Sequence, residues 1–215
     1  APWSVTQMTH DELMKTVFTA CEPRPEVLSG DLREEMFAAR LRDVMDKTAD
    51  DVYKKPRLFF ENTFPTEGLR TLLREVIGRM SGKAPTNSPF VRLETSFGGG
   101  KTHNLIALYH LTQAHADGLP DGIVHADWLP KKPWASAGIV GSSDTDPANG
   151  IKHGDVTVHT LWGELAWQLG KKDGFDLVRK SDEMLVAPGP QFLEELIGDK
   201  PALIMLDEVA RHLRV

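Results

Sequence analysis

The sequence predicts an α/β fold in which helices cover both faces of a parallel sheet. Residues 202–206 (ALIML) form a continuous apolar run, and Asp207 and Glu208 follow it directly. Such a run is typical of a parallel strand that is buried on both faces. Residues 90–93 (FVRL) predict a second strand, because a glycine-rich turn and then a helical pattern over 104–111 follow them. Strands that alternate with helices in this way indicate a three-layer α/β sandwich.

A helical segment is predicted before this core. Residues 10–18 and 31–47 carry helical patterns, so we divide the chain into a helical N-terminal segment at 1–57 and a core at 58–215. The second helix has charges of mixed sign, which we interpret as a solvated face; they are Arg33, Glu34, Glu35, Arg40, Arg42 and Asp43. The core then begins with a helix capped by Thr66, whose apolar face is Leu69, Leu72, Leu73, Val76 and Ile77.

A short strand and a long polar loop are predicted in the middle of the core. Residues 137–140 are apolar and predict the strand, and the loop follows over 141–154. A loop at the carboxyl end of a strand can contact a ligand, which makes Asp144 and Asp146 candidates for such a contact. An ordinary surface loop is the alternative interpretation, and we regard it as the more common case.

Two further helices are predicted before the last strand. Residues 160–169 form an amphipathic pattern that Gly170 should end, and a short helix is expected over 191–197. Trp162 and Trp167 are expected to pack against the sheet.

Residues 94–103 (ETSFGGGKTH) have the character of a phosphate-binding loop. Glycines between a strand and a helix let several backbone N–H groups approach a polyphosphate, and the helix N-terminus adds partial positive charge. In the pattern G-x-x-x-x-G-K-[ST], the lysine reaches the β- and γ-phosphates and the hydroxyl binds Mg²⁺. Thr95 stands where the pattern has its first glycine. The predicted nucleotide contacts are Phe97, Gly98, Gly99, Gly100, Lys101, Thr102 and His103.

The acidic pair after the last strand predicts the metal site and the chemistry. The carboxyl ends of parallel strands meet at one edge of a sheet, so Asp207 should lie near the glycine-rich loop. We expect Thr102 and Asp207 to hold Mg²⁺, Lys101 to neutralise phosphate charge, and Glu208 to polarise the attacking water. A helix cap made by Asp207 with a first-turn acid at Glu208 is the alternative. The ligand predicted from these residues is ATP with Mg²⁺.

Aromatic residues before the glycine-rich loop are candidates for the base site. Phe60, Thr63 and Phe64 are candidate contacts for the adenine, while core packing is the more common role of each phenylalanine.

The composition limits the class of protein. The 215 residues are 40% hydrophobic and 26% charged, which is typical of a globular chain. No apolar stretch approaches the roughly 20 residues that span a bilayer, so we expect no membrane partner. The single cysteine, Cys21, suits a reducing cytoplasm. The net charge of −6 argues against a dominant nucleic-acid footprint within this chain.

Four segments together resemble one family. They are residues 58–73 (LFFENTFPTEGLRTLL), 94–111 (ETSFGGGKTHNLIALYHL), 160–169 (TLWGELAWQL) and 203–208 (LIMLDE). They resemble the predicted AAA+-like P-loop ATPases of the prokaryotic family called domain of unknown function 499. Members are usually far longer than this chain, so the resemblance implies an N-terminal portion whose ATPase core is incomplete at its C-terminus.

The resemblance also implies partners. Similar proteins tend to be encoded beside DNA methylases and helicases, which implies a role on DNA or in phage defence through regions outside this chain. An AAA+-like enzyme implies a homo-oligomer in which a neighbouring subunit supplies an arginine finger. Three alternatives to the ATPase remain open: a nucleotide-gated switch or scaffold with little turnover, a small-molecule P-loop kinase, and a DNA-binding module with a degenerate loop.

Overall fold

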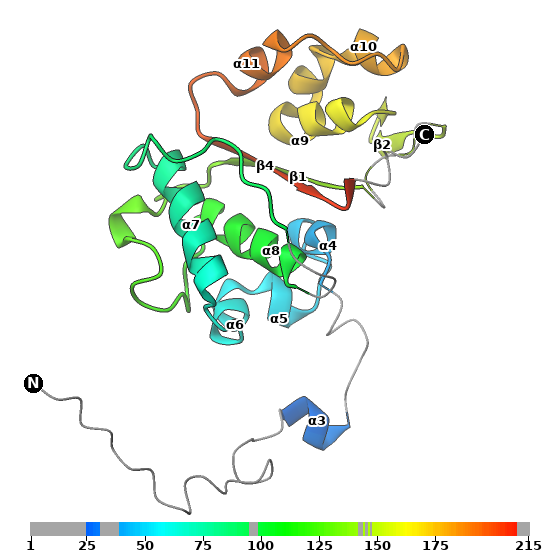
Figure 1. The fold of residues 1–215 in the computed structure, drawn as a ribbon. Helices are drawn as coiled ribbons and strands as arrows, with labels where there is room; N and C mark the ends of the chain where they lie inside the picture. The colour runs from blue at the N-terminus through cyan, green and yellow to red at the C-terminus, as the bar shows by residue number, and fades with distance from the viewer. Residues whose placement is uncertain are drawn as a thin grey trace, which may run out of the picture. The chain divides into compact units, whose positions relative to one another are not determined.

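The computed structural model describes residues 25–30, 39–94, 99–141, 144, 146 and 148–209. The chain divides into two units, Ala1–Phe37 and Ala38–Val215. The element described in the first unit is α3 (Pro25–Ser29), and the second unit has a mixed α/β architecture (Figure 1). The boundary after residue 57 stays a prediction. The helices described between residues 41 and 57 belong to the second unit.

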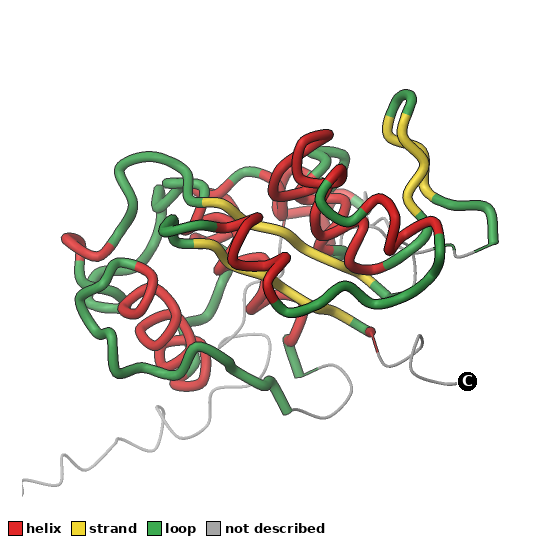
Figure 2. The backbone as a smooth tube through the Cα atoms, turned by 90° about the horizontal axis from the view of Figure 1, so that it is seen from above, coloured by secondary structure: helices red, strands yellow, loops and turns green. Residues whose placement is uncertain are grey.

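A small parallel sheet lies between helices of the second unit. β1 (Ala135–Val140) and β4 (Ala202–Asp207) pair in parallel, with Val140 opposite Asp207. Helices flank the paired strands (Figure 2), with α9 (Leu161–Asp176) and α4 (Leu41–Met45) in contact with β1. The predicted mixed α/β class and its parallel sheet are therefore confirmed.

Alternation along the strands assigns their side chains to two cores. Ala137 and Ile139 of β1 and Ile204 of β4 pack with Leu165 of α9. Val140 and Met205 belong to a larger core on the other face. The buried side chains of that larger core from the helices are Leu41, Val44, Phe59, Phe60, Leu69, Leu72, Leu73, Ile77, Ile106, Ala107, Leu108 and Leu111. Side chains from both faces of each strand therefore reach a core, although Leu206 near the end of β4 is 47% exposed.

Side chains occupy the edge of β1 that faces away from β4. The amide of Gln168 accepts from Gly138 N at 2.8 Å and donates to Gly138 O at 3.0 Å, in place of a neighbouring strand. Asp144 accepts from Val140 N at 2.7 Å on the same side. These bonds satisfy backbone groups that a sheet edge otherwise exposes. Gln168 and Asp144 therefore block strand addition along this part of β1.

The strand predicted over residues 90–93 is wrong for this structure. These residues form no strand, and Phe90 and Val91 are 73% and 40% exposed. The hydroxyl of Ser88 donates to Phe90 O at 2.6 Å and accepts from Phe90 N at 3.2 Å, so it takes both backbone groups that a ladder would use. A short segment such as residues 90–93 needs a neighbouring strand to become part of a sheet. Among the described strands, β4 pairs only with β1.

The strand predicted over 137–140 is confirmed and begins two residues earlier, at Ala135. The predicted loop 141–154 was too long. Its last residues form β2 (Ile151–His153), which pairs in antiparallel fashion with β3 (Val156–Val158). Gly154 has a φ of 63° in the turn between these strands, a conformation that glycine adopts without a steric penalty.

The helices of the second unit agree with the local signals. α7 (Glu67–Met80) begins at Thr66, whose hydroxyl accepts from Leu69 N at 3.2 Å. α8 (Lys101–Thr112) follows the glycine-rich turn, and α11 (Gln191–Ile197) ends at Gly198. The other elements are α5 (Asp51–Lys54), α6 (Pro56–Glu61), α10 (Arg179–Glu183) and the 3₁₀ turn η2 (Ala126–Trp128).

Three predicted helix features differ from the structure or lie beyond it. The helix over 10–18 lies outside the described residues, and so does the beginning of the helix over 31–47, of which α4 is the described part. α9 continues past Gly170 to Asp176, although Lys171 has non-helical angles (φ 52°, ψ −138°). The predicted stop is therefore a kink between two helical stretches.

The prediction that Trp162 and Trp167 pack against the main sheet is wrong. Both belong to a separate core with Val156, Val158 and other residues, and the ring of Trp167 stacks on that of His153 at 4.8 Å. The reason is helical geometry, because Leu161, Leu165 and Leu169 form the stripe of α9 in the core with Ile139. The tryptophans lie on another face of α9, toward the β2–β3 hairpin.

Candidate functional site

The structure brings Thr102 and Asp207 into direct contact, although they lie 105 residues apart in the sequence. Thr102 is the second residue of α8, and Asp207 is the last residue of β4. The threonine hydroxyl donates to Asp207 Oδ2 at 2.7 Å, and Asp207 is only 8% exposed. The two residues predicted to share a metal therefore lie side by side at the carboxyl end of the sheet.

Glycine sets the start of α8. Gly100 is the N-cap residue and has a φ of 76°, in the left-handed region that favours glycine. Because Gly100 has no side chain, it makes no side-chain cap bond to this 12-residue helix. The N–H groups of a helix N-terminus and the helix dipole both favour an anion at this end. Gly99 and Gly100 are exposed and Lys101 is half-buried, while Phe97 and Gly98 lie outside the described residues.

The oxygen donors at this point fit Mg²⁺. A hydroxyl and a carboxylate supply two hard oxygen ligands, and Mg²⁺ usually takes one or two carboxylates together with waters and substrate phosphates. This donor set therefore suits a metal that also binds a phosphate ligand. No group of three or more His, Cys, Asp or Glu side chains that could hold a metal occurs within the part of the chain that the structure describes.

Glu208 follows Asp207 on the surface. It is exposed, and its φ of 52° lies in the left-handed region that non-glycine residues rarely adopt. Such conformations cost on the order of 1–3 kcal/mol and persist only where neighbouring structure holds them. The chain thus turns sharply at the residue that the sequence assigns to water activation.

The comparisons with known proteins give one match. The family model described as the DUF499 N-terminal domain matches residues 17–125 and 138–215. The chain belongs to this family. The matched ranges include the glycine-rich loop, Asp207 and Glu208. The comparison with curated proteins and the comparison with solved structures each gave no match.

The ring of His103 contacts Phe59 and Thr63, at the end of α6. Its ring stacks on that of Phe59 with centroids 4.4 Å apart, and its Nε2 lies 2.8 Å from the hydroxyl of Thr63. Because that hydroxyl already donates to Phe59 O, it must accept from His103, so Nε2 carries the proton. Burial lowers the pKa of His103, which keeps the ring neutral at pH 7. These contacts anchor the first turn of α8 to α6; the predicted contact of His103 with the nucleotide stays a prediction.

The three candidates for the base site have different surroundings. Phe60 is 2% exposed inside the larger core, so its proposed contact with a base does not fit this structure. Thr63 is 8% exposed and bonded as described above. Phe64 is 83% exposed. Of the two phenylalanines, Phe64 is the one whose ring is exposed to solvent.

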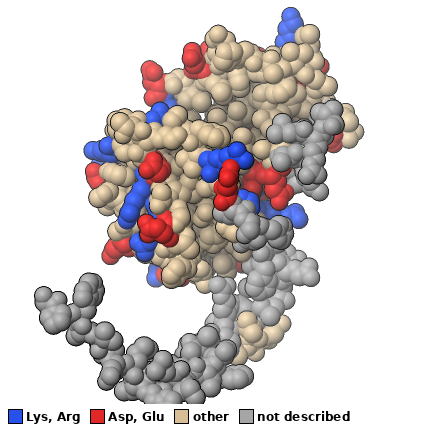
Figure 3. Space-filling model, viewed as in Figure 1, with Lys and Arg blue, Asp and Glu red and all other residues tan. Residues whose placement is uncertain are grey.

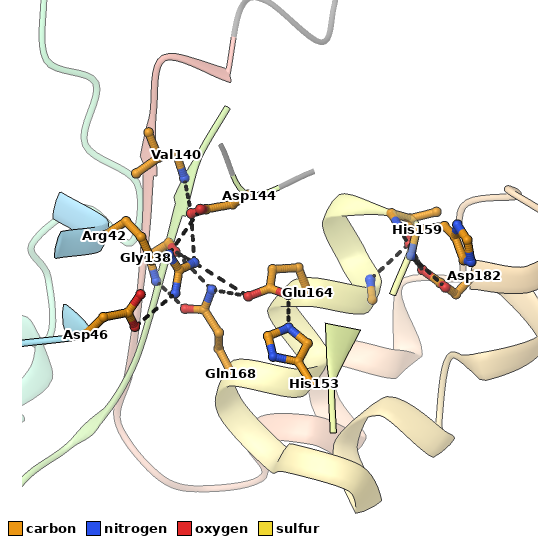
Figure 4. Close-up of polar contacts among 12 residues, drawn as sticks. Arg42, Asp46, Gly138, Val140, Asp144, His153, His159, Glu164, Gln168 and Asp182 are labelled. Atoms are coloured by element: carbon orange, nitrogen blue, oxygen red, sulfur yellow. Dashed lines mark hydrogen bonds and ion pairs between the residues drawn. The ribbon is translucent and has the colours of Figure 1, made fainter. Parts of the chain in front are cut away.

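A buried polar network lies beside β1, and sequence reasoning missed it (Figure 4). Arg42 donates to both carboxylate oxygens of Asp144, at 3.0 and 2.7 Å, and to Gly138 O at 3.0 Å. The same guanidinium lies 3.5 Å from Glu164, which is 2% exposed and pairs with His153 at 2.6 Å. Arg42 therefore does not belong to a solvated face, and the expectation for it was wrong. Asp46 lies four residues away, at 3.9 Å, but Asp144 and Glu164 lie more than 100 residues away, which hid their pairing with Arg42 from a local reading.

One local signal could have pointed to part of this network. Glu164 and Gln168 are four residues apart on α9, among the leucines that face the sheet, and Gln168 donates to Glu164 at 2.8 Å. Two polar residues on an apolar face require buried partners. The network also changes the interpretation of the loop aspartates. Asp144 is 4% exposed and structural, whereas Asp146 bonds to Ala148 and Asn149 within its own turn.

Proposed function

We propose that this chain is the ATP-binding and ATP-hydrolysing module of a larger protein, with the site built as in P-loop ATPases of the AAA+-like type. The observation that carries the proposal is the hydrogen bond from Thr102 to Asp207. It joins the predicted phosphate-binding loop to the predicted metal-binding acid. A chance Gly-Lys-Thr sequence and a chance helix cap would have no reason to meet.

Each residue has a separate task in this proposal. The N-terminal turn of α8 binds phosphate through backbone N–H groups, and Lys101 neutralises charge on the β- and γ-oxygens. Thr102 and Asp207 would hold Mg²⁺, which would supply a Lewis acid for charge that develops on the phosphate oxygens. Glu208 orients the attacking water and accepts its proton. A carboxylate directly after the metal-binding acid favours hydrolysis over a switch without turnover.

The distribution of charge on the surface is relevant to the proposed DNA and protein partners. On the face drawn in Figure 3, basic and acidic side chains are interspersed. A nucleic-acid contact usually shows as a basic patch, which the described residues of that face do not form. We propose that contacts with DNA or DNA-modifying proteins are made by regions outside this chain, and that a neighbouring subunit of a homo-oligomer supplies an arginine finger. No helix among the described residues combines the length and apolar character needed to cross a membrane.

Nucleotide titration tests the proposal. A fluorescent ATP analogue is titrated into the wild type, Lys101→Ala and the surface control Lys131→Ala, with Mg²⁺ and with EDTA. We expect Lys101→Ala to lose at least tenfold in affinity, because a charge-assisted bond to phosphate is worth about 1.5–3 kcal/mol. The control should bind like the wild type. Equal dissociation constants for wild type and Lys101→Ala would overturn the phosphate-loop assignment.

Phosphate release then separates the remaining functions. The same protein is assayed at steady state with ATP, with and without DNA. Turnover supports the ATPase, binding without turnover supports the switch or scaffold, and transfer of the phosphoryl group to an added small molecule supports the kinase.

A further inference from the structure

The turn after β1 touches the backbone of Glu208. Gly141 N donates to Asp207 O at 2.8 Å, which continues the parallel pairing one residue beyond β1. A Cβ added to Gly141 would lie 2.5 Å from Glu208 O and 2.7 Å from the Cα of Val209. Both neighbours are backbone atoms, which cannot rotate away as a flexible side chain can. Only glycine at residue 141 lets the chain pass this closely after Asp207.

This contact lies where the backbone needs support. Glu208 holds a φ of 52°, which a non-glycine residue keeps only when its surroundings impose it. The described contacts beside Glu208 include the hydrogen bond from Gly141 N to the carbonyl of Asp207 and the close approach of Gly141 to the backbone of Glu208. A displacement of the turn after β1 would therefore press on the backbone that carries the Glu208 side chain.

Asp144 and Arg42 hold that turn. Asp144 N donates to Val140 O at 2.9 Å, and its carboxylate accepts from Val140 N at 2.7 Å, so the turn closes on the end of β1. Arg42 of α4 donates hydrogen bonds to both carboxylate oxygens of Asp144 and to Gly138 O. A bidentate arginine is a geometrically rigid brace. Since Asp144 is 4% exposed, water competes little for these bonds.

We propose that Gly141, together with the Arg42–Asp144 pair behind it, positions Glu208 for water activation. This inference rests on the proposed ATPase function. None of the three residues needs to touch the nucleotide, and they act through Glu208. A misplacement of about 1 Å at a reacting group can lower a rate by about 100-fold without changing ligand contacts.

The test compares Gly141→Ala and Asp144→Asn with two matched controls in the full chain. Gly68→Ala is the glycine control, because an added Cβ there meets nothing within 4 Å. Asp155→Asn, at an exposed position in the β2–β3 turn, is the control for loss of an aspartate charge. For Gly141→Ala and Asp144→Asn we expect ATP turnover to fall about 10–100-fold, with ATP affinity within about threefold of the wild type. The controls should retain both quantities.

Double variants separate positioning from general damage. If Gly141 and Asp144 act through Glu208, then Glu208→Gln combined with either change should turn over no more slowly than Glu208→Gln alone. Additive losses, or equal losses of affinity and turnover, would overturn the inference. If Gly141→Ala fails to fold in a thermal melt, Asp144→Asn and Arg42→Lys carry the same test. A wild-type rate for Glu208→Gln alone would instead refute the assigned water-activating role on which the inference rests.

Discussion

Thr102 and Asp207 form a hydrogen bond of 2.7 Å between the first turn of α8 and the last residue of β4. The hydroxyl donates its hydrogen in this bond and keeps its oxygen lone pairs, and Asp207 is 8% exposed. In the proposed function, Thr102 could therefore bind Mg²⁺ while it still donates to Asp207. The bond thus already holds together the two groups that we propose as metal ligands.

The hydroxyl of Thr102 should support metal-dependent binding. We expect Thr102→Ala to lower the affinity for Mg²⁺–ATP about tenfold or more, because a hydrogen bond or ligand contact to a charged group is worth about 1.5–3 kcal/mol. Affinity measured in EDTA should change little. Thr102→Ser keeps the hydroxyl and is the matched control. Calorimetric titration of ATP with and without Mg²⁺ measures the difference, and equal losses in both conditions would argue against a metal role.

Glu208 should serve turnover and not binding. We expect Glu208→Gln to slow ATP hydrolysis by about 10²–10⁴-fold, because the amide cannot accept the proton of the attacking water. ATP affinity should stay near that of the wild type. Glu195→Gln, an exposed position on α11, is the control for loss of one surface charge. Wild-type phosphate release by Glu208→Gln would leave Glu208 as a turn residue only.

The stability of the fold should depend on pH through His110. Its Nε2 donates to Tyr53 O at 2.8 Å, and its side chain lies between aromatic rings at 2% exposure. Burial lowers its pKa from 6.5 to about 4. The unfolded chain therefore binds a proton more readily than the folded chain between these two values. Stability is fully present above pH 6.5 and falls by up to about 1.4 kcal/mol per pH unit as the pH decreases to about 4.

Denaturant titrations from pH 7 to 4 measure this dependence. His110→Gln keeps a donor for Tyr53 O and cannot titrate, so its unfolding free energy should vary less over this range. His125→Gln, an exposed position, controls for removal of an ordinary histidine. Identical pH profiles for the wild type and His110→Gln would contradict the assignment.

Asp182 should be important for the stability of α9. It is fully buried and accepts from the backbone N of His159 at 3.0 Å and of Thr160 at 2.9 Å, as well as from the Thr160 hydroxyl. Asp182→Asn places an amide against these donors, so we expect a loss of about 1–3 kcal/mol in the free energy of unfolding. Asp173→Asn, an exposed residue of α9, should change it by less than about 0.5 kcal/mol. Urea denaturation compares the two variants.

Local signals in the sequence were sufficient for several single elements, while α5, α6, α10 and the β2–β3 hairpin were not predicted. The cap at Thr66, the apolar period of α7 and the glycine turn before α8 each depend on residues within one or two turns. The continuous apolar run of β4 predicted a strand, and the structure has it there, with Met205 buried and Leu206 47% exposed. The predicted proximity of Thr102 and Asp207 is confirmed, although the strand predicted over residues 90–93, on which that expectation relied, is not formed.

The sequence alone thus determined the α/β class, the main helices, the strand that ends at Asp207, and the resemblance to the family that the comparison shows. Tertiary structure decided the features that depend on residues far apart in the sequence, such as strand pairing and the burial of charged side chains. Residues 90–93 did not become a strand, because Ser88 took the backbone groups of Phe90 and no described strand paired with them. The guanidinium of Arg42 is largely buried because it pairs with the carboxylate of Asp144, 102 residues away, and this pairing offsets the cost of removing its charge from water. A pairing of this kind leaves no trace in local periodicity, since its energy arises only when the chain has folded.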